Sequence, residues 1–284
     1  MAVTTSAPTG LPCAPDAVDD FLGQPTAAVI AAVARMRGPF LVLGAGGKIG
    51  LHLTLMLRRA LDQLGRTDRV VAVSRFKSLR DCDDFARRGL ETIACDLTAP
   101  GALESLPEAP SVFYLAGVKF GTAASPGLLR ELNIELPKRV AARFRHARIA
   151  AFSSGCVYPF VPVESGGAIE STPLSAVGDY AASCIGREHA FAAGAATYGT
   201  AVALLRLNYA VEFRYGLLVD IAQQVLAGRP VDVTTGHVNV IWQSDAVAHC
   251  IQALELAGSP AAPVNLTGPG TLAVRDLAQR FGSL

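Results

Sequence analysis

The sequence predicts an α/β protein with a doubly wound parallel sheet and a smaller lobe after it. Short β-branched runs alternate with helical patterns along most of the chain, as expected for strands that helices cover on both faces. A glycine cluster joins the first such run to a helical pattern. The chain is also rich in glycine (27 residues) and poor in aromatic residues (7%), which favours helices packed closely on a sheet over an all-β sandwich.

The elements are predicted in the following order along the chain. Residues 1–24 are expected to form a flexible leader, and an Ala-rich amphipathic helix follows at about 26–37. Strands are then predicted at residues 40–43, 69–73, 91–94, 111–115, 148–152 and 201–207, with helices at about 49–64 and 79–88 among them. Later helices near 217–227 and 244–257 alternate with short strands at 231–233, 238–241 and 264–266. We therefore expect a leader and short helix over residues 1–37, a sheet domain over 38–207, and a small lobe over 208–284 that is interleaved with the sheet domain.

Charge and cysteine content exclude several classes of protein. Lysine and arginine number 25 against 24 aspartate and glutamate, so the chain has no basic field for binding nucleic acid. The six cysteines show no CxxC and no His/Cys spacing typical of zinc, so we expect no metal site, no disulfide framework and a reducing compartment. The sequence shows neither a signal peptide nor an apolar run long enough to span a membrane, which predicts a cytoplasmic protein.

The glycine cluster has the spacing Gly44-x-x-Gly47-x-x-Gly50, between the first strand and the first long helix. Gly44 permits a tight turn, Gly47 lets the backbone approach a diphosphate, and Gly50 lets the helix lie close to the strand. The free N–H groups at the helix start, from Lys48 and Ile49 onward, then face the phosphates. This arrangement predicts a Rossmann-type dinucleotide site, although a glycine turn without a ligand has the same sequence.

The end of the second strand predicts which dinucleotide binds. An acidic residue there would bind the ribose 2′-hydroxyl of NAD, but the strand ends in Ser74-Arg75 without a carboxylate. Arg75, helped by Ser74 and Lys77, suits the 2′-phosphate of NADP, so NADP is expected first and NAD second. The alternative is that Arg75 stacks on adenine or faces solvent. Asp96, after the third strand, either contacts the adenine amino group or caps a turn.

Further segments resemble the extended short-chain dehydrogenase/reductases, the NAD-dependent epimerase/dehydratase family, over about residues 38–284. They are Asp96-Leu97, Tyr114-Leu-Ala116-Gly117, Phe152-Ser153-Ser154-Gly-Cys-Val-Tyr158, Tyr180, Arg206-Leu-Asn208 and Asn265-Leu-Thr-Gly268. The resemblance implies cofactor contacts by Asp96, Leu97, Ala116, Gly117, Asn133, Tyr180 and Asn208. It also implies a homodimeric enzyme that oxidises or reduces a hydroxyl or keto carbon of a sugar, sugar nucleotide or similar polar metabolite, with net epimerisation as one outcome.

The resemblance also implies a Ser–Tyr–Lys mechanism. In it the tyrosine is acid or base for a substrate hydroxyl, the serine hydrogen-bonds that oxygen, and the lysine lowers the tyrosine pKa. Ser154 and Tyr180 match the first two positions, whereas the lysine position, four residues after the tyrosine, holds Cys184. Because a neutral thiol cannot favour tyrosinate, Tyr180 is expected to keep a pKa near its reference value of about 10.

Three interpretations of Cys184 stay open. In the first, another cation replaces the lysine: Lys119, after the fourth strand, is the first candidate and Arg187 the second. In the second, the chemistry needs no tyrosinate. In the third, catalysis has been lost, and the protein is an NADP-binding regulatory or interaction protein.

Some residues outside this set are also candidates. Pro137 is expected to kink the helix that carries Asn133, and the resemblance implies that this asparagine helps to hold a water behind the catalytic pair. Arg214 is a candidate for gripping a substrate carboxylate or phosphate, and Trp242 for lining the substrate pocket with Ser154. Surface or packing roles are the alternatives for both. The chain ends earlier than extended members of the resembling family usually do, so the small substrate-binding lobe is expected to be shorter than theirs.

Overall fold

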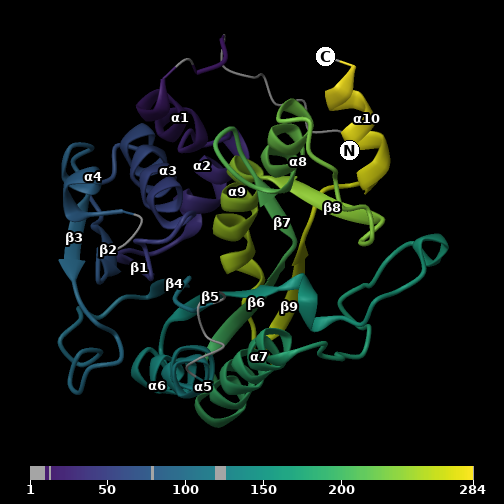
Figure 1. The fold of residues 1–284 in the computed structure, drawn as a ribbon. Helices are drawn as coiled ribbons and strands as arrows, with labels where there is room; N and C mark the ends of the chain where they lie inside the picture. Colours follow the sequence, from purple (N-terminus) through teal and green to yellow (C-terminus); the bar gives the residue numbers. More distant parts are fainter. Residues whose placement is uncertain (1–9, 13, 78–79, 119–125, 284) are drawn as a thin grey trace.

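A seven-stranded parallel sheet forms the centre of the protein (Figure 1). The computed structural model describes residues 10–12, 14–77, 80–118 and 126–283. The strands follow the order β3-β2-β1-β4-β5-β6-β9, and every neighbouring pair is parallel. They are β1 (Phe40–Leu43), β2 (Val70–Ser74), β3 (Glu91–Ala94), β4 (Ser111–Tyr114), β5 (Arg148–Ser154), β6 (Ala201–Leu207) and β9 (Ala262–Leu266). The order reverses between β1 and β4, which creates a crevice at the carboxyl ends of the strands and confirms the predicted doubly wound sheet.

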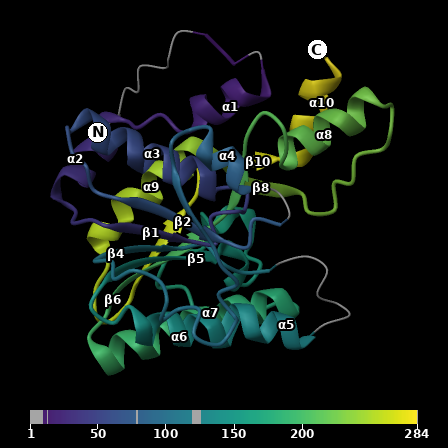
Figure 2. The same ribbon diagram turned by 90° about the vertical axis from the view of Figure 1, so that its left-hand side faces the viewer.

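Helices cover both faces of the sheet (Figure 2). On one face lie α2 (Ala27–Arg35), α3 (Gly50–Gln63) and α9 (Gln243–Ala253), and on the other lie α6 (Leu136–Arg143) and α7 (Asp179–Tyr198). Successive side chains of a strand point to opposite faces, so Phe40 belongs to the core under α3 and Leu41 to the core under α6. Because both faces are covered, the central strand β1 is apolar throughout. No helix in the described part of the chain has the length and apolarity that crossing a membrane requires.

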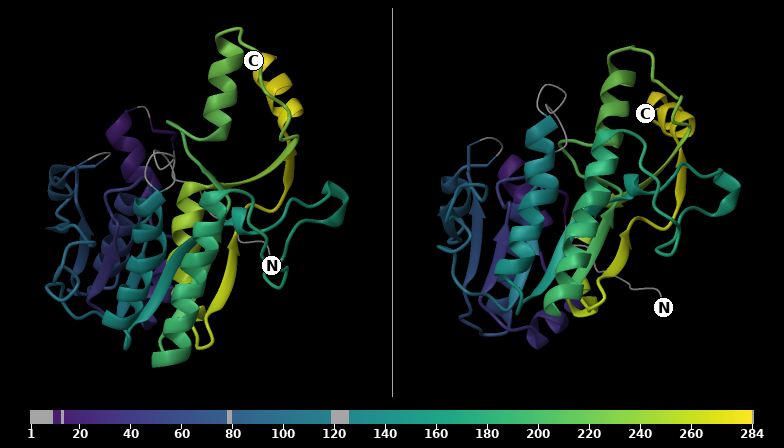
Figure 3. Two further views of the ribbon diagram at one scale, coloured as in Figure 1. Left: turned by 60° about the horizontal axis from the view of Figure 1, so that its bottom comes forward. Right: turned by 90° about the horizontal axis from the view of Figure 1, so that it is seen from below.

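A small lobe follows β6 and stands apart from the sheet (Figure 3). Its own sheet has the order β10-β8-β7, from β7 (Tyr209–Val211), β8 (His237–Trp242) and β10 (Thr271–Ala273). α8 (Leu217–Leu226) and α10 (Val274–Gly282) pack side by side over this sheet. Between β8 and β10 the chain returns to the main sheet as α9 and β9. The strand predicted at 231–233 is wrong, because the Asp232 carboxylate caps a local turn by accepting from the Thr234 amide.

Two helical segments differ from the sequence-based expectation. Where the sequence predicts a flexible leader, α1 (Pro15–Leu22) forms a helix that lies against α3 and buries Val18 and Leu22 (Figure 1). The helix predicted at 79–88 is shorter, with α4 at Cys82–Ala86. The expectation of a flexible leader is therefore wrong for the residues of α1, since that prediction could not take account of their tertiary contacts.

Candidate functional site

A cavity of about 220 Å³ opens at the carboxyl edge of the sheet, where the strand order reverses. Its walls include the predicted cofactor contacts Gly44, Gly47, Ser74, Arg75, Asp96, Leu97, Ala116 and Gly117. The other lining residues are Gly46, Phe76, Lys77, Cys95, Leu115, Leu132 and Leu136. The fold thus brings the ends of β1, β2, β3 and β4 together around one space.

The three glycines of the predicted motif are required for different structural reasons. Gly44 has a φ of 86°, and a Cβ there would lie 2.5 Å from the Ala116 amide nitrogen. A Cβ on Gly50 would lie 2.2 Å from the Ala45 carbonyl oxygen, so this glycine lets α3 start close to β1. A Cβ on Gly47, in contrast, would have no neighbour closer than the Gly44 carbonyl oxygen, at 3.6 Å. Gly47 therefore leaves open space on the cavity side, which fits the close approach of a dinucleotide diphosphate to the start of α3.

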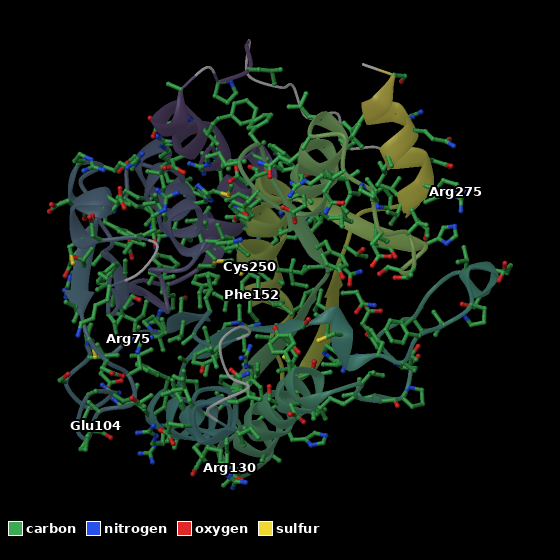
Figure 4. The ribbon with its side chains drawn as sticks, viewed as in Figure 1. Arg75, Glu104, Arg130, Phe152, Cys250 and Arg275 are labelled. Carbon is green, nitrogen blue, oxygen red and sulfur yellow. The ribbon has the colours of Figure 1, made fainter. Side chains whose placement is uncertain are left out.

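Basic residues gather where β2 ends. Arg75 and Lys77 line the cavity, and Arg75 lies on the β3 side of the molecule (Figure 4). The Asp96 carboxylate accepts from the Thr98 amide and hydroxyl at 3.0 and 2.7 Å. These hydrogen bonds lower the pKa of Asp96, and the charges of Arg75 and Lys77 lower it further. Asp96 thus caps a turn and also lines the cavity. Strand β2 itself contains no aspartate or glutamate before Arg75 and Lys77.

Ser154, Tyr180 and Cys184 lie around the carboxyl end of β5. Ser154 ends the strand, and its hydroxyl accepts from the Cys156 amide at 3.3 Å. Tyr180 lies in the first turn of α7, and Cys184 is buried one turn later. Burial raises the pKa of the Tyr180 phenol, and its hydrogen bond to the Cys184 thiol raises the pKa further. Tyr180 therefore stays protonated at neutral pH, and its pKa is above the reference value expected from the sequence.

Of the two candidate cations, Lys119 lies outside the described residues, and Arg187 is buried near Phe152 and Tyr180. The Arg187 side chain is only 6% exposed and donates to the Phe152 carbonyl oxygen at 2.9 Å and to Asn133 Oδ1 at 2.5 Å. Its Nη2 lies 2.2 Å from where a Cβ on Gly117 would be, so the guanidinium abuts the cavity wall. The Arg187 charge lowers the pKa of Tyr180, against the larger effect of burial. Arg187 is thus the buried cation that the described residues place near Tyr180.

Asn133 connects this arginine to the tyrosine. It lies in a π-helical turn, η1 (Glu131–Glu135), which directly precedes α6 and Pro137, where the sequence predicts a kink. Its side-chain amide donates to the Val118 carbonyl oxygen and to the Ser183 hydroxyl, and its Oδ1 accepts from the Val118 amide. The Ser183 hydroxyl in turn donates to the Tyr180 carbonyl oxygen at 2.7 Å. The asparagine therefore fixes the first turn of α7 against the loop after β4.

The predicted cofactor and substrate contacts from residue 208 onward each interact with other side chains of the protein. Asn208 donates to the Thr267 hydroxyl at 3.0 Å. The Trp242 ring packs edge-on against Phe213, with centroids 4.9 Å apart, which fits the packing role. The Arg214 guanidinium donates to two carboxylates, at 2.7 Å to Asp19 and at 3.0 Å to Glu212. Arg214 thus holds the lobe through ion pairs in this structure, and its predicted role as a substrate grip gains no support.

Asp19 of α1 is the centre of a buried polar network. Its carboxylate is 1% exposed and accepts hydrogen bonds from Arg80, Arg214 and the Nε2 of His52. Burial alone would raise the pKa of Asp19, but these hydrogen bonds together hold it well below its usual range. Gln243 bonds the Nδ1 of His52 at 2.7 Å and accepts from the Tyr215 hydroxyl. The network therefore joins α1, α3 and the small lobe.

His52 is expected to make the fold sensitive to acid. Burial lowers its pKa, so the folded protein holds a neutral imidazole, whereas the unfolded chain binds a proton below about pH 6.5. The unfolded state then binds more protons, and stability falls as the pH drops below that value, by up to about 1.4 kcal/mol per pH unit. Urea unfolding between pH 5 and 8 measures this slope, and His52→Gln should flatten it. An equal slope in both proteins would exclude His52 as the cause.

Comparison with known proteins identifies the family of this chain. The sequence profile of the NAD dependent epimerase/dehydratase family matches residues 40–260. The chain belongs to this family. It is thus an enzyme of the extended short-chain dehydrogenase/reductase type. No curated protein sequence matches it.

Solved enzymes share the fold of this epimerase/dehydratase family member. A double mutant of dTDP-glucose 4,6-dehydratase from Streptomyces venezuelae, with NAD bound, has a TM-score of 0.73 at 20% identity, covering 86% of this chain and 80% of the other. UDP-glucose 4-epimerase from Thermus thermophilus, in complex with NAD, has a TM-score of 0.70 at 20% identity, and the match covers 86% of this chain and 82% of the epimerase. UDP-glucuronic acid 4-epimerase from Bacillus cereus, also in complex with NAD, has a TM-score of 0.69 at 19% identity, and the match covers 84% of this chain and 81% of that enzyme.

The structure shows site residues that the sequence analysis leaves out or ranks too low. The glycine spacing left out Gly46, which lines the cavity and whose Cβ would lie 2.7 Å from the Ser74 hydroxyl oxygen. Lys48 is predicted as a cofactor contact, and in the structure its ammonium lies 3.9 Å from the centre of the Tyr215 ring in the lobe. Arg187 ranked second as a cation, although its spacing of seven residues from Tyr180 places both on one helix face.

Proposed function

We propose that the protein uses NADP to reduce or oxidise a hydroxyl or keto carbon of a sugar or sugar nucleotide. The observation that carries the proposal is the cavity at the β1/β4 reversal, whose glycines leave room for a diphosphate and whose β2 end carries Arg75 and Lys77. Similar solved structures support the substrate class, since one holds UDP-glucose with NAD and another UDP with NAD. A homodimer is inferred from the family resemblance, and a cytoplasmic location from the sequence, which shows neither a signal peptide nor a long apolar run.

Separate parts of the cavity would hold separate parts of NADP. The turn of Gly44 and Gly47 and the start of α3 would hold the diphosphate, and Arg75 with Lys77 and Ser74 the 2′-phosphate. The bound nicotinamide supplies the hydride chemistry. The protein then has to orient the two reactants and to move one proton to or from the substrate oxygen.

At neutral pH Tyr180 is in the protonated form that a proton donor needs at the start of a reduction. A neutral phenol can donate its proton to the oxygen of a keto substrate, whereas oxidation of an alcohol needs the tyrosinate, which burial disfavours. Ser154 would hydrogen-bond the same oxygen. Arg187 supplies positive charge near the phenol, as the lysine of the resembling family does, and Lys119 stays a candidate for the same task.

A second candidate function is NADP binding without turnover, as a regulatory or interaction protein. A specific observation favours it: a buried, neutral thiol hydrogen-bonds Tyr180 where the resemblance implies a lysine. The two functions differ in what an assay detects. Oxidation of NADPH in the presence of 4-keto sugar nucleotides supports the enzyme, whereas tight NADP binding with no turnover of any keto or hydroxyl sugar nucleotide supports the regulator.

The cations at the end of β2 are expected to select NADP over NAD. Because hydrogen bonds to charged groups contribute about 1.5–3 kcal/mol each, the double variant Arg75→Ala/Lys77→Ala should weaken NADPH binding by at least about tenfold. NADH binding should change far less. Titration by nucleotide fluorescence measures both affinities.

The matched control is Arg69→Ala, which removes an exposed arginine that precedes β2 and pairs with Glu91. This variant should bind both nucleotides as the parent does. A parent protein that binds NADH ten times more tightly than NADPH would contradict the assignment of Arg75 and Lys77.

A further inference from the structure

Two cysteine thiols meet beside Tyr180. Cys156 lies in the short turn η2 (Gly155–Val157) directly after β5, and α7 packs against this turn. The thiol of Cys184 hydrogen-bonds both the Cys156 thiol and the Tyr180 hydroxyl. Cys156 is exposed and Cys184 is fully buried. One sulfur is therefore open to reagents from solvent, and the other lies behind it, next to the phenol.

The Cys156 turn is held in place by groups that do not involve the thiols. The Cys156 amide donates to the hydroxyl of Ser154, and the Tyr158 amide donates to the Gly155 carbonyl oxygen. The Cys156 side chain can thus rotate without loss of these backbone hydrogen bonds. A disulfide needs an S–S bond near 2.05 Å, and rotation about χ1 can bring the Cys156 sulfur toward the Cys184 thiol that it hydrogen-bonds. It also needs Cβ atoms about 3.8 Å apart, a separation that the backbones of η2 and α7 set where they pack together.

We propose that Cys156 and Cys184 form a reversible disulfide through exchange with a low-molecular-weight disulfide such as oxidised glutathione. The Cys156 sulfur attacks one sulfur of the oxidant, which breaks its S–S bond, releases one glutathione thiol and leaves glutathione bound to Cys156. The Cys184 sulfur then attacks the Cys156 sulfur and releases the second glutathione thiol. The two cysteines lose two electrons to the oxidant, and their two protons leave on the two released thiols.

The order of attack follows from exposure and acidity. Cys156 reacts first because it is exposed. The hydrogen bond to Cys156 and burial both raise the pKa of the Cys184 thiol, so Cys184 reacts only with a sulfur that is already beside it. The disulfide removes the Cys184 thiol proton and changes the partner of the Tyr180 hydroxyl. The bond is independent of the proposed function, whereas its effect on turnover depends on it.

Mass spectrometry after incubation with oxidised glutathione tests the disulfide. The background carries Cys13→Ser, Cys82→Ser and Cys95→Ser, so that adducts at these cysteines do not interfere. In this background the protein should lose two hydrogens, and a digest without reductant should link the peptides of Cys156 and Cys184. Dithiothreitol should reverse the change, and a further Cys250→Ser substitution should leave it unaltered.

Single variants separate the two roles. Cys184→Ser should accumulate a stable glutathione adduct on Cys156, and Cys156→Ser should acquire neither adduct nor disulfide. Cys184→Ala repeats the first measurement in case the serine disturbs the core. A stable adduct on Cys156 without a link to Cys184, or two thiols that stay free, would overturn the proposal. These masses are read without any substrate, so a failure of the proposed enzymatic activity does not change them.

Discussion

Replacing Asp19 by alanine is expected to lower the free energy of unfolding by about 3–5 kcal/mol, because it removes the buried carboxylate that Arg80, Arg214 and His52 share. The Asp19 carboxylate accepts from Arg80 at 2.8 and 2.9 Å and from Arg214 at 2.7 Å, and it is also the acceptor for His52. The substitution also removes the ion pair between Asp19 of α1 and Arg214 of the small lobe. Urea unfolding of the parent and the variant at pH 7.5 measures the difference.

The matched control for this variant is Asp20→Ala, on the next residue of α1. The Asp20 side chain is half exposed and pairs with Arg59 at the surface, so its loss should cost less than about 1 kcal/mol. A free energy of unfolding for Asp19→Ala within about 1 kcal/mol of the parent would show that the network around Asp19 does not stabilise the fold.

Replacing Tyr180 by phenylalanine is expected to lower turnover by about 10²–10⁴-fold, the usual contribution of a positioned acid or base. Because the phenol acts on the substrate oxygen, the affinity for NADPH should change by less than about threefold. Tyr198→Phe is the matched control, since this tyrosine is partly exposed at the far end of the same helix. Steady-state rates with nucleotide fluorescence titrations check both parts. Equal turnover in Tyr180→Phe and the parent would remove Tyr180 from the mechanism.

Arg187 variants separate charge from packing in the same experiment. Removing the positive charge with Arg187→Met should raise the Tyr180 pKa further, which moves the pH profile of alcohol oxidation upward and leaves keto reduction near neutral pH in place. Arg187→Lys keeps a charge and should restore much of the parent profile. Identical pH profiles in the parent and in Arg187→Met would show that the arginine only holds Phe152 and Asn133 together.

The parts of the fold that depend on local sequence are predictable. β1 and β2 are continuous apolar runs, and the glycine spacing after β1 follows from the geometry of one turn and the helix that it starts. The distortion at η1 also follows from a local cause, since Pro137 disfavours a regular helix ahead of it. The cofactor cavity is therefore the part of the site that sequence alone locates best.

Contacts between distant residues explain what the sequence does not predict. Asp19 meets Arg214, which is 195 residues away, and this ion pair ties α1 to the small lobe. Neither residue carries a local signal of that pairing. Likewise, the short hydrogen bond from Arg187 to Asn133 spans 54 residues and brings α7 to η1. Spacing places Arg187 on the Tyr180 face of α7, but only the packing of the two helices buries it there.

The central claim is that the cavity beside Gly47 binds a pyridine nucleotide, and calorimetry with NADP and NAD tests it most directly. The decisive variant is Gly47→Val, because the valine side chain would enter the cavity where the diphosphate is proposed to bind. A Cβ at this position meets no protein atom closer than 3.6 Å, so the substitution should not disturb the fold. We expect saturable NADP binding to the parent and binding at least tenfold weaker in a variant with an unchanged thermal unfolding curve. No binding of either nucleotide to the parent at millimolar concentration, or equal binding to both proteins, would contradict the claim.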